Sequence, residues 1–321
     1  MADVLRSGQG KRCLGRINAF AETCMTHKKI GFIGQGWIGK NYANDFEQRG
    51  FSVVRYAKEP EYAGTRKDIA TCDIVFIAVP TPTTEAGFDD SIVRAVLPLI
   101  GKGKTAVIKS TILPGTTESI QKQFPDVFVF HSPEFLTEAT AAHDAAHPER
   151  NIVGISNNTH EARAKAQEVL DVLPPAPFAT ICASREAELV KYGGNCWFYT
   201  KVVFVNLLYD LAQKLGCSWD VIRDAMVADP RIGRTHLDPI HKSGRGAGGH
   251  CFVKDFAAFE GLYATLIDDP RGQAVLKSLR DKNIELLLGS NKDLDLLRET
   301  YGDRINEKNS KREEKDMLHT A

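Results

Sequence analysis

The sequence predicts an α/β protein: a Rossmann-like, doubly wound parallel sheet in the N-terminal part, followed by an all-α domain with a long central helix. Two observations predict the sheet. Short apolar runs recur at the spacing of strand–helix–strand units, and the first of them leads directly into a GxGxxG motif. The helical part is predicted by an apolar-rich stretch from Ser184 to Leu215, which ends at Gly216 and is too long for a strand.

The composition is that of a globular protein without a charge bias. The 321 residues include 41 Lys and Arg and 41 Asp and Glu, so the formal net charge is zero. We therefore expect neither nucleic acid nor a membrane as a partner, and no apolar run has the length of a membrane span. The 7 cysteines are scattered without CxxC pairs. We interpret them as reduced thiols of a cytoplasmic protein that has no metal site.

The glycine motif has the context that a dinucleotide-binding turn needs. The predicted strand 29–33 precedes it, and a helical stretch and a second strand, 51–56, follow. Gly34 permits the turn, Gly36 lets a pyrophosphate approach the backbone, and Gly39 allows close packing of helix on strand. The free N–H groups at the start of the helix then face the phosphates.

The choice between the two nicotinamide dinucleotides depends on the end of the second strand. An acidic residue is expected there to bind the ribose hydroxyls, and Ala57 occupies that position. Glu59 could substitute for it, which favours NAD, whereas Arg55 or Lys58 could accept the 2′-phosphate of NADP. We expect NAD, with NADP as the alternative.

Polar residues gather where the later strands end. The predicted strand 73–79 ends in Pro80 and Thr81, the strand 105–109 ends before Thr111, and the strand 127–130 leads into the segment 131–138. In a parallel sheet these ends share one edge, which is where ligands bind. Ordinary turn formation is the alternative explanation, because Pro, Ser and Thr populate turns anyway.

The stretch from Ser184 to Leu215 carries more apolar residues than one helix face needs. A helix that is apolar nearly all round is buried on several sides, so we expect a second copy of the chain to pack against it as a homodimer. Lys191 and Asn195 lie four residues apart and therefore share one face of this helix.

A glycine-rich loop from Gly244 to Gly249 is followed by Cys251, Lys254 and Asp255 at the start of a predicted helix. Glycines let a backbone approach a ligand closely. A cysteine at a helix N-terminus beside a lysine favours the thiolate and can act as a nucleophile. A small buried cysteine is the alternative interpretation.

We expect four segments in the chain. They are a flexible N-terminal extension (1–28), an NAD-binding Rossmann-like domain (29–180), a helical central dimerisation domain (181–288) and a charged, disordered tail (289–321). A start at Met25, just before the first strand, is an alternative for the extension.

Seven motifs, in this order, resemble those of the UDP-glucose/GDP-mannose dehydrogenase family: GQGWIG, VPTPT, STILPGT, SPEFLTE, EAELVKYGGN, DPRIG and GRGAGGHCFVKD. The resemblance covers about residues 29–265 and is nearer to the UDP-sugar branch. It implies that C6 of a nucleotide sugar, UDP-glucose or a related UDP-hexose, is oxidised to the uronic acid by two NAD-dependent hydride transfers, as in polysaccharide biosynthesis. Members usually carry a second Rossmann-like domain that grips the nucleotide, and we expect this domain to be absent.

The resemblance implies a catalytic set of Cys251, Lys191, Asn195, Asp255, Thr111 and Glu138. Cys251 would hold the C6 aldehyde as a thiohemiacetal and then as a thioester. Lys191, with Asn195 beside it, would stabilise the oxyanion. The other members would position a water and exchange protons through it.

The resemblance also implies residues that bind the cofactor and the substrate. Those for NAD are Gly34, Gly36, Trp37, Ile38, Gly39, Val79, Pro80, Thr81, Thr111, Glu138 and Lys254. Those for the sugar nucleotide are Glu134, Phe135, Leu136, Lys191, Asn195, Arg231, Gly246, Gly248 and Lys254. Arg231 would reach the sugar nucleotide across the dimer interface.

Two alternatives to this function stay open at the level of sequence. The first is a non-catalytic or truncated member that binds NAD or a sugar nucleotide as a dimeric module. The second is the same chemistry on GDP-mannose or another activated sugar. The family's usual proline before the motif lysine is replaced here by Val253.

Overall fold

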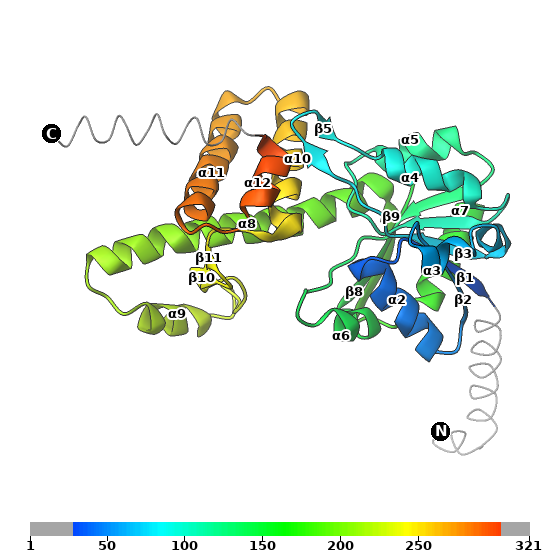
Figure 1. Ribbon diagram of the computed structural model, residues 1–321, viewed down its shortest axis with the longest axis horizontal. Helices are drawn as coiled ribbons and strands as arrows, with labels where there is room; N and C mark the ends of the chain where they lie inside the picture. The colour runs from blue at the N-terminus through cyan, green and yellow to red at the C-terminus, as the bar shows by residue number, and fades with distance from the viewer. Residues whose placement is uncertain (1–27, 303–321) are drawn as a thin grey trace, which may run out of the picture. The chain divides into compact units, whose positions relative to one another are not determined.

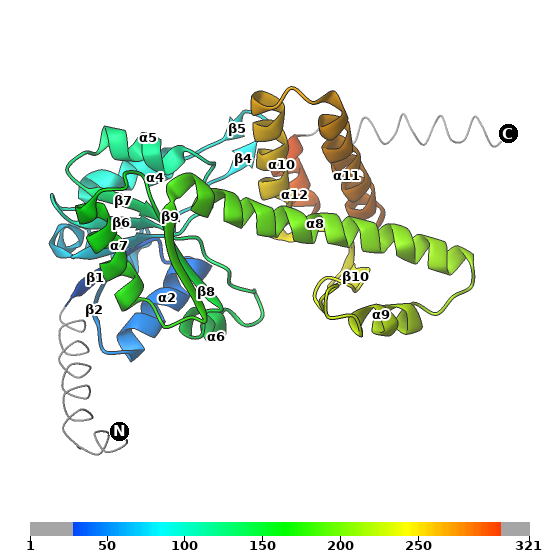
Figure 2. The same ribbon diagram turned by 180° about the vertical axis from the view of Figure 1, so that it is seen from behind.

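The computed structural model describes residues 28–302 of the chain. Contacts within the chain divide it into two compact units. Among the described residues, the first unit contains those up to Pro80 and Ser91–Glu188, and the second contains Thr81–Asp90 and those from Leu189 to residue 302. The elements of both units are drawn in Figures 1 and 2.

The first unit is built on a seven-stranded sheet in the order β2-β1-β3-β6-β7-β8-β9. Its strands are β1 (Lys29–Ile33), β2 (Ser52–Tyr56), β3 (Ile74–Ile77), β6 (Thr105–Ile108), β7 (Phe128–His131), β8 (Arg150–Ile155) and β9 (Phe178–Ala183). Helices flank the sheet, which confirms the predicted Rossmann-like fold. They are α2 (Trp37–Gln48), α3 (Pro60–Ala63), α4 (Ser91–Val96), α5 (Thr116–Gln123), α6 (Ala141–Ala146) and α7 (His160–Val172), with short 3-10 turns at Asp68–Thr71 and Leu97–Leu99.

The central strands form because their side chains are apolar on both faces. All four residues of β3 and all four of β6 are buried, as is usual for parallel strands that helices cover on both sides. Aromatic rings fill the space between the sheet and α2. The rings of Phe32 and Phe76 stack at 5.1 Å, and Phe46 meets the Phe32 ring edge-on at 5.3 Å.

The sheet differs from the expected one at its far edge. β8 runs antiparallel to β7, so the sheet is mixed. The connection between them holds only the six-residue helix α6, which is shorter than the usual crossover helix. β9 was not predicted: its residues are partly or fully exposed, and it follows directly after a proline-rich stretch.

The second unit is mainly helical. It contains most of α8 (Ser184–Lys214), then α9 (Trp219–Val227), α10 (Gly249–Leu266), α11 (Pro270–Gly289) and α12 (Leu294–Tyr301), with the small hairpins β4–β5 (Thr83–Thr84, Gly87–Phe88) and β10–β11 (Ile240–His241, Gly244–Arg245). α8 is 31 residues long and begins at Ser184, as the sequence predicts. Its core contact with α10 is a stack of Tyr199 on Phe256 at 3.9 Å.

The structure differs from the expected disorder where it describes the tail. Residues 290–293 form an ordered turn, and α12 follows it. α12 is held by apolar side chains, because Leu297 is buried in a cluster with Val253 and Leu287. The rest of the tail and residues 1–27 lie outside the described residues, so those expectations stay predictions.

Candidate functional site

The turn after β1 has the geometry of a dinucleotide-binding turn. Gly34 has φ of 90°, and a Cβ there would lie 2.2 Å from the carbonyl oxygen of Ala78. A Cβ on Gly39 would lie 1.9 Å from the carbonyl oxygen of Gly34, whereas a Cβ on Gly36 would meet nothing within 4 Å. Gly36 is the N-cap of α2 and makes no side-chain cap hydrogen bond, so no capping side chain occupies the N-terminal end of the helix. This arrangement fits the pyrophosphate of a dinucleotide.

Of the two cations at the end of β2 that could accept the 2′-phosphate of NADP, Arg55 is engaged by other side chains and Lys58 is exposed. Ala57 is buried, and Arg55 is already engaged: its guanidinium donates to both carboxylate oxygens of Glu47 at 2.9 and 2.7 Å and to Asn44 at 2.7 Å. A 2′-phosphate would have to displace that carboxylate. Glu59, the expected substitute for the ribose-binding acid, is exposed at the N-terminal end of α3.

Hydrogen bonds join the carboxyl ends of β3, β6 and β7. The Ser110 hydroxyl accepts from the Val79 N–H at 3.0 Å and donates to the Val79 carbonyl at 2.6 Å. The buried Lys109 ammonium donates to the Ser132 hydroxyl at 3.1 Å. These bonds fix the sheet edge at which Thr111 lies. Thr111 is 9 % exposed.

The two predicted carboxylates of the segment after β7, Glu134 and Glu138, differ in burial. Glu134 is 3 % exposed and accepts a hydrogen bond from the Leu136 N–H at 2.8 Å, so it shapes its own loop. Glu138 is exposed. The Arg150 guanidinium lies 3.7 Å from the centre of the Phe135 ring, which holds this ring against β8.

Predicted residues of the second unit meet around Asp255. This carboxylate is 1 % exposed, accepts from the Asn195 amide of α8 at 2.5 Å, and pairs with the Lys254 ammonium. Lys191, one helical turn before Asn195, is 5 % exposed. Cys251, in the first turn of α10, is exposed. Hence Asn195, Lys254 and Asp255 form one connected group, and the thiol lies one turn away along the same helix.

Cys251 differs from the buried cysteines in its surroundings. Burial, with the Asp255 carboxylate nearby, strongly raises the pKa of the Cys196 thiol. Burial also raises the pKa of Cys72 to about 11 and raises the pKa of Cys182. Thiols with raised pKa values are poor nucleophiles at neutral pH. The exposed thiols of the described residues are Cys217 and Cys251, and Cys251 alone stands beside predicted catalytic residues.

Arg231 and Thr81 have surroundings that the sequence did not indicate. The Arg231 side chain is 88 % exposed and folds back on Asp229, to which it donates at 2.6 and 2.9 Å. Thr81 is buried and belongs to the second unit, whereas Val79 and Pro80 belong to the first. Trp37 is 41 % exposed beside the glycine turn.

Two buried side chains outside the predicted site hold the predicted loops in place. Glu188 accepts from the backbone N–H groups of Gly115 and Thr117 at 2.6 and 2.8 Å, so it caps α5 from the start of α8. Asn283 pairs with both backbone groups of Ala247, at 2.6 and 3.0 Å, inside the glycine-rich loop. Glu188 lies within a quoted motif, but no sequence pattern pointed to Asn283.

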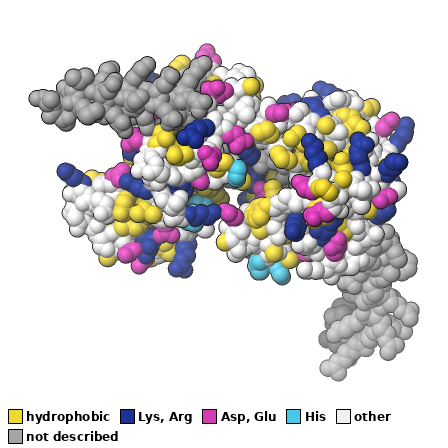
Figure 3. All heavy atoms as spheres, viewed as in Figure 1, with side chains coloured by type: hydrophobic (Ala, Val, Ile, Leu, Met, Phe, Trp, Pro, Cys, Tyr) yellow, Lys and Arg dark blue, Asp and Glu magenta, His cyan; other side chains and the backbone are white. Residues whose placement is uncertain are grey.

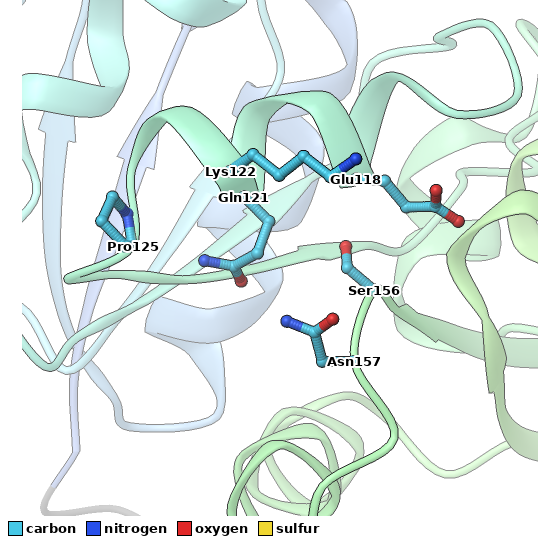
Figure 4. Close-up of a pocket in the computed structure, with 6 residues that line it drawn as sticks. All are labelled: Glu118, Gln121, Lys122, Pro125, Ser156 and Asn157. Carbon is cyan, nitrogen blue, oxygen red and sulfur yellow. The ribbon is translucent and has the colours of Figure 1, made fainter.

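A groove of about 300 Å³ lies elsewhere in the first unit (Figure 4). It is lined by Glu118, Gln121, Lys122, Pro125, Ser156 and Asn157. Because β8 is antiparallel to β7, the end of β8 lies at the sheet edge opposite the glycine turn. None of the predicted site residues lines this groove. In the described residues we also find no cluster of His, Cys, Asp and Glu that could hold a metal ion.

Comparison with known families gives two adjacent matches. Residues 59–171 match the NAD binding domain of the UDP-glucose/GDP-mannose dehydrogenase family, and residues 185–283 match the central domain of the same family. The chain belongs to this family. The first unit thus carries the family's NAD-binding domain, in agreement with the predicted cofactor. No helix in residues 28–302 is long and apolar enough to cross a membrane.

Relatives within the family cover different shares of the chain. The UDP-glucose 6-dehydrogenase of Rickettsia typhi is 34% identical over 242 residues, which are 71% of this chain and 54% of that protein. UDP-glucose 6-dehydrogenase TuaD of Bacillus subtilis is 34% identical over 202 residues, 59% of this chain and 42% of the relative. A solved UDP-glucose dehydrogenase from Pyrobaculum islandicum is 28% identical with a TM-score of 0.69, and the match covers 82% of this chain and 71% of that one. The chain therefore spans about half the length of these curated relatives.

Proposed function

We propose that this protein oxidises C6 of a nucleotide sugar, UDP-glucose or a related UDP-hexose, to the uronic acid. NAD, when bound, accepts one hydride in each of two oxidation steps. The observation that carries the proposal is the exposed Cys251 thiol in the first turn of α10, one turn from the Asn195–Asp255 hydrogen bond. The family match and the names of the relatives support the same substrate class.

Cys251 would act in the second half of the reaction. The first oxidation removes a hydride from C6 and a proton from its hydroxyl, which leaves an aldehyde. The Cys251 thiolate adds to the aldehyde carbon and forms a thiohemiacetal. Loss of a second hydride and the hydroxyl proton gives a thioester, and attack by water releases the carboxylate and restores the thiol.

The other proposed catalytic residues would stabilise charge and move protons. A buried ammonium such as Lys191 stabilises the C6 oxyanion more strongly than an exposed one, because less water screens it. Asp255 is fixed by its two partners and would orient the hydrolytic water. We retain Thr111 and Glu138 as members of this set, with Glu138 as the acid/base that acts through the water.

We propose separate sets of binding residues for NAD and for the sugar nucleotide. For NAD we retain Gly34, Gly36, Trp37, Ile38, Gly39, Val79, Pro80, Thr81, Thr111, Glu138 and Lys254. For the sugar nucleotide we retain Glu134, Phe135, Leu136, Lys191, Asn195, Arg231, Gly246, Gly248 and Lys254. Arg231 would have to exchange its bond to Asp229 for the ligand, and its exposure leaves it able to do so.

We further propose that the protein is a homodimer through α8. Large apolar side chains of this helix are exposed in the single chain, among them Trp197 (65 %), Phe204 (57 %) and Leu211 (55 %). Hydrophobic side chains also reach the surface in the part that holds α9 and the end of α8 (Figure 3). Large apolar side chains that gather on an exposed helix face are typical of protein interfaces.

The test uses purified protein with NAD and, separately, UDP-glucose, UDP-N-acetylhexosamines and GDP-mannose. We expect two NADH per UDP-hexose, and we expect Cys251→Ala to abolish this yield. Cys217→Ala is the matched control, because Cys217 is the other exposed thiol of the described residues. Turnover only with GDP-mannose would reassign the substrate. Binding of NAD without turnover on any sugar would instead support a non-catalytic module.

A further inference from the structure

The turn between α11 and α12 docks on the glycine-rich loop. We call this turn, Ser290 to Asp293, the clamp turn. All its contacts described below lie within the second unit. It begins after residue 283, the last residue that matches the family's central domain, so the family match gives no account of what it does.

Lys292 and Ser290 bind the backbone of the loop. Lys292 is 5 % exposed, and its ammonium donates to the carbonyl oxygens of Gly246 at 2.9 Å and Gly244 at 3.4 Å. The Ser290 hydroxyl accepts from the Arg245 N–H at 3.0 Å. A buried ammonium that donates to backbone carbonyls keeps these carbonyls in a single geometry, because breaking the hydrogen bonds would leave a buried charge without partners.

Asp293 binds the first residue of the helix that carries Cys251. The Gly249 N–H donates to the Asp293 carboxylate at 2.7 Å. Gly249 is the first residue of α10, so this bond satisfies a donor that has no partner within the helix. The fit is tight, since a Cβ on Gly248 would lie 1.9 Å from a carboxylate oxygen of Asp293 and 2.8 Å from the Lys292 side chain.

The clamp turn is itself held in place. Lys292 donates its N–H to the Leu287 carbonyl at 2.9 Å, and the Leu297 N–H bonds the Asp293 carbonyl at 3.1 Å. Asp293 has φ of 54°, a left-handed conformation that aspartate, asparagine and glycine tolerate better than other residues. The turn thus presents Lys292 and Asp293 to the loop from a fixed backbone.

We propose that Lys292 and Asp293 are positioning residues for Cys251. They hold the loop and the N-terminal end of α10, and thereby fix where the thiol stands relative to the Asn195–Asp255 pair. The inference rests on the proposed function, in which Cys251 attacks the substrate. The Asp293 carboxylate also places a negative charge at the positive end of α10, so Asp293→Asn is needed to separate the effect of this charge from the effect of the hydrogen bond.

The experiment compares Asp293→Gly with Asp293→Asn in the full chain. Glycine removes the side chain without straining the left-handed backbone, whereas asparagine keeps an oxygen that can accept from Gly249. Asp295→Asn is the matched control, because the Asp295 side chain is 98 % exposed in α12. Circular dichroism and thermal melts check that each variant folds.

The first readout needs no substrate. Alkylation of Cys251 by iodoacetamide is followed by peptide mass spectrometry, with Cys217 of the same sample as reference. We expect the ratio of the two rates to rise about threefold or more in Asp293→Gly and less in Asp293→Asn, because only glycine frees the loop. An unchanged ratio in Asp293→Gly overturns the proposal. Equal rises in both variants assign the effect to charge alone and also overturn it.

The second readout is turnover. We expect Asp293→Gly to lower kcat about tenfold with KM within about twofold, since a displaced nucleophile impairs chemistry more than binding. Asp293→Asn should recover most of kcat. If the wild-type chain turns over no sugar, the proposed function fails while the alkylation ratio still decides the positioning role. If it turns over normally but alkylation does not respond, the positioning role alone fails.

Discussion

At the scale of single residues, the glycine turn shows how similar motif positions serve different purposes. Gly39 has no room for a side chain, because its Cβ would lie 1.9 Å from the Gly34 carbonyl oxygen. Gly36 has room, so its requirement is not one of packing. The space beside it is where a pyrophosphate would approach the first turn of α2.

This contrast predicts that alanine at one position lowers stability and alanine at the other weakens NAD binding. Gly39→Ala should lower the free energy of unfolding by about 1–3 kcal/mol, because the turn must shift to admit the methyl group. Gly36→Ala should keep the melting temperature of the free protein and weaken NAD binding. Thermal melts with and without NAD measure both quantities. A normal melting temperature for Gly39→Ala, or an unaffected NAD-induced shift for Gly36→Ala, would contradict the assignment.

The thiols make a second point at this scale. Cysteine identity does not predict reactivity, because burial raises the pKa values of Cys72 and Cys196, while Cys251 is exposed at a helix start. The motif indicated Cys251 as the nucleophile because glycines precede it and Lys254 and Asp255 follow it. The structure adds the exposure of the thiol and the bonds that fix Asp255.

At the scale of elements, Glu188 joins the start of α8 to the start of α5. Its carboxylate is fully buried and caps α5 through Gly115 and Thr117. Desolvation raises the pKa of this carboxyl above its ordinary value, although the hydrogen bonds from Thr117 and Gly115 oppose the rise. The protonated form is therefore favoured more in the folded state than in the unfolded state.

The sign of this shift predicts how stability depends on pH. The folded-state pKa exceeds the unfolded one, so the stabilisation is fully present below the ordinary value of 4.5 and is lost as pH rises through the folded pKa. We expect the free energy of unfolding of the wild type, relative to Glu188→Gln, to be larger at pH 4.5 than at neutral pH. Urea unfolding at both pH values measures it, with Glu161→Gln as control, because Glu161 is exposed in the first turn of α7. A difference that grows with pH would show that the hydrogen bonds outweigh desolvation.

The elements also show where apolar pattern predicts structure and where it does not. The pattern predicted β1, β3, β6 and α8, because their buried residues are contiguous or periodic in the sequence. It missed β9, which is partly exposed. It missed α12 because charged residues surround the few leucines that anchor it, and those leucines are buried only once α10 and α11 are in place.

At the scale of the whole molecule, the exposed apolar residues of α8 argue for assembly. Phe204 and Leu211 lie seven residues apart, which is two helical turns, so they project from the same face. A single chain would leave this face in water. Burial of each large side chain in an interface would contribute about 1.5–3 kcal/mol.

This face predicts the effect of a charge on assembly. We expect the wild type to sediment as a dimer and Phe204→Asp to shift it to the monomer at micromolar concentration, because a buried unpaired carboxylate destabilises an interface. Val275→Asp on α11 is the control, since Val275 is 59 % exposed on another helix. Sedimentation velocity distinguishes the two species. A monomeric wild type would exclude the proposed dimer.

The fold class, the glycine turn, the family and the candidate nucleophile could all be predicted from the amino-acid sequence. These features are local, since a motif of adjacent residues or a regular apolar period carries each of them. The pattern of β1 and α2 predicts a dinucleotide-binding turn without reference to distant residues. The acidic residue that would bind the ribose hydroxyls was likewise expected within a few residues of Ala57.

The side chains that hold these local features in place became apparent only from contacts between distant parts of the chain. Asp293 reaches Gly249 across 44 positions, and Glu188 reaches Gly115 across 73. The engagement of Arg55 by Glu47, which takes up one of the two cations that could bind a 2′-phosphate, is likewise a matter of contact. Such pairs leave no period or motif in the sequence, because a hydrogen bond needs only two atoms to meet, and folding brings them together from anywhere along the chain.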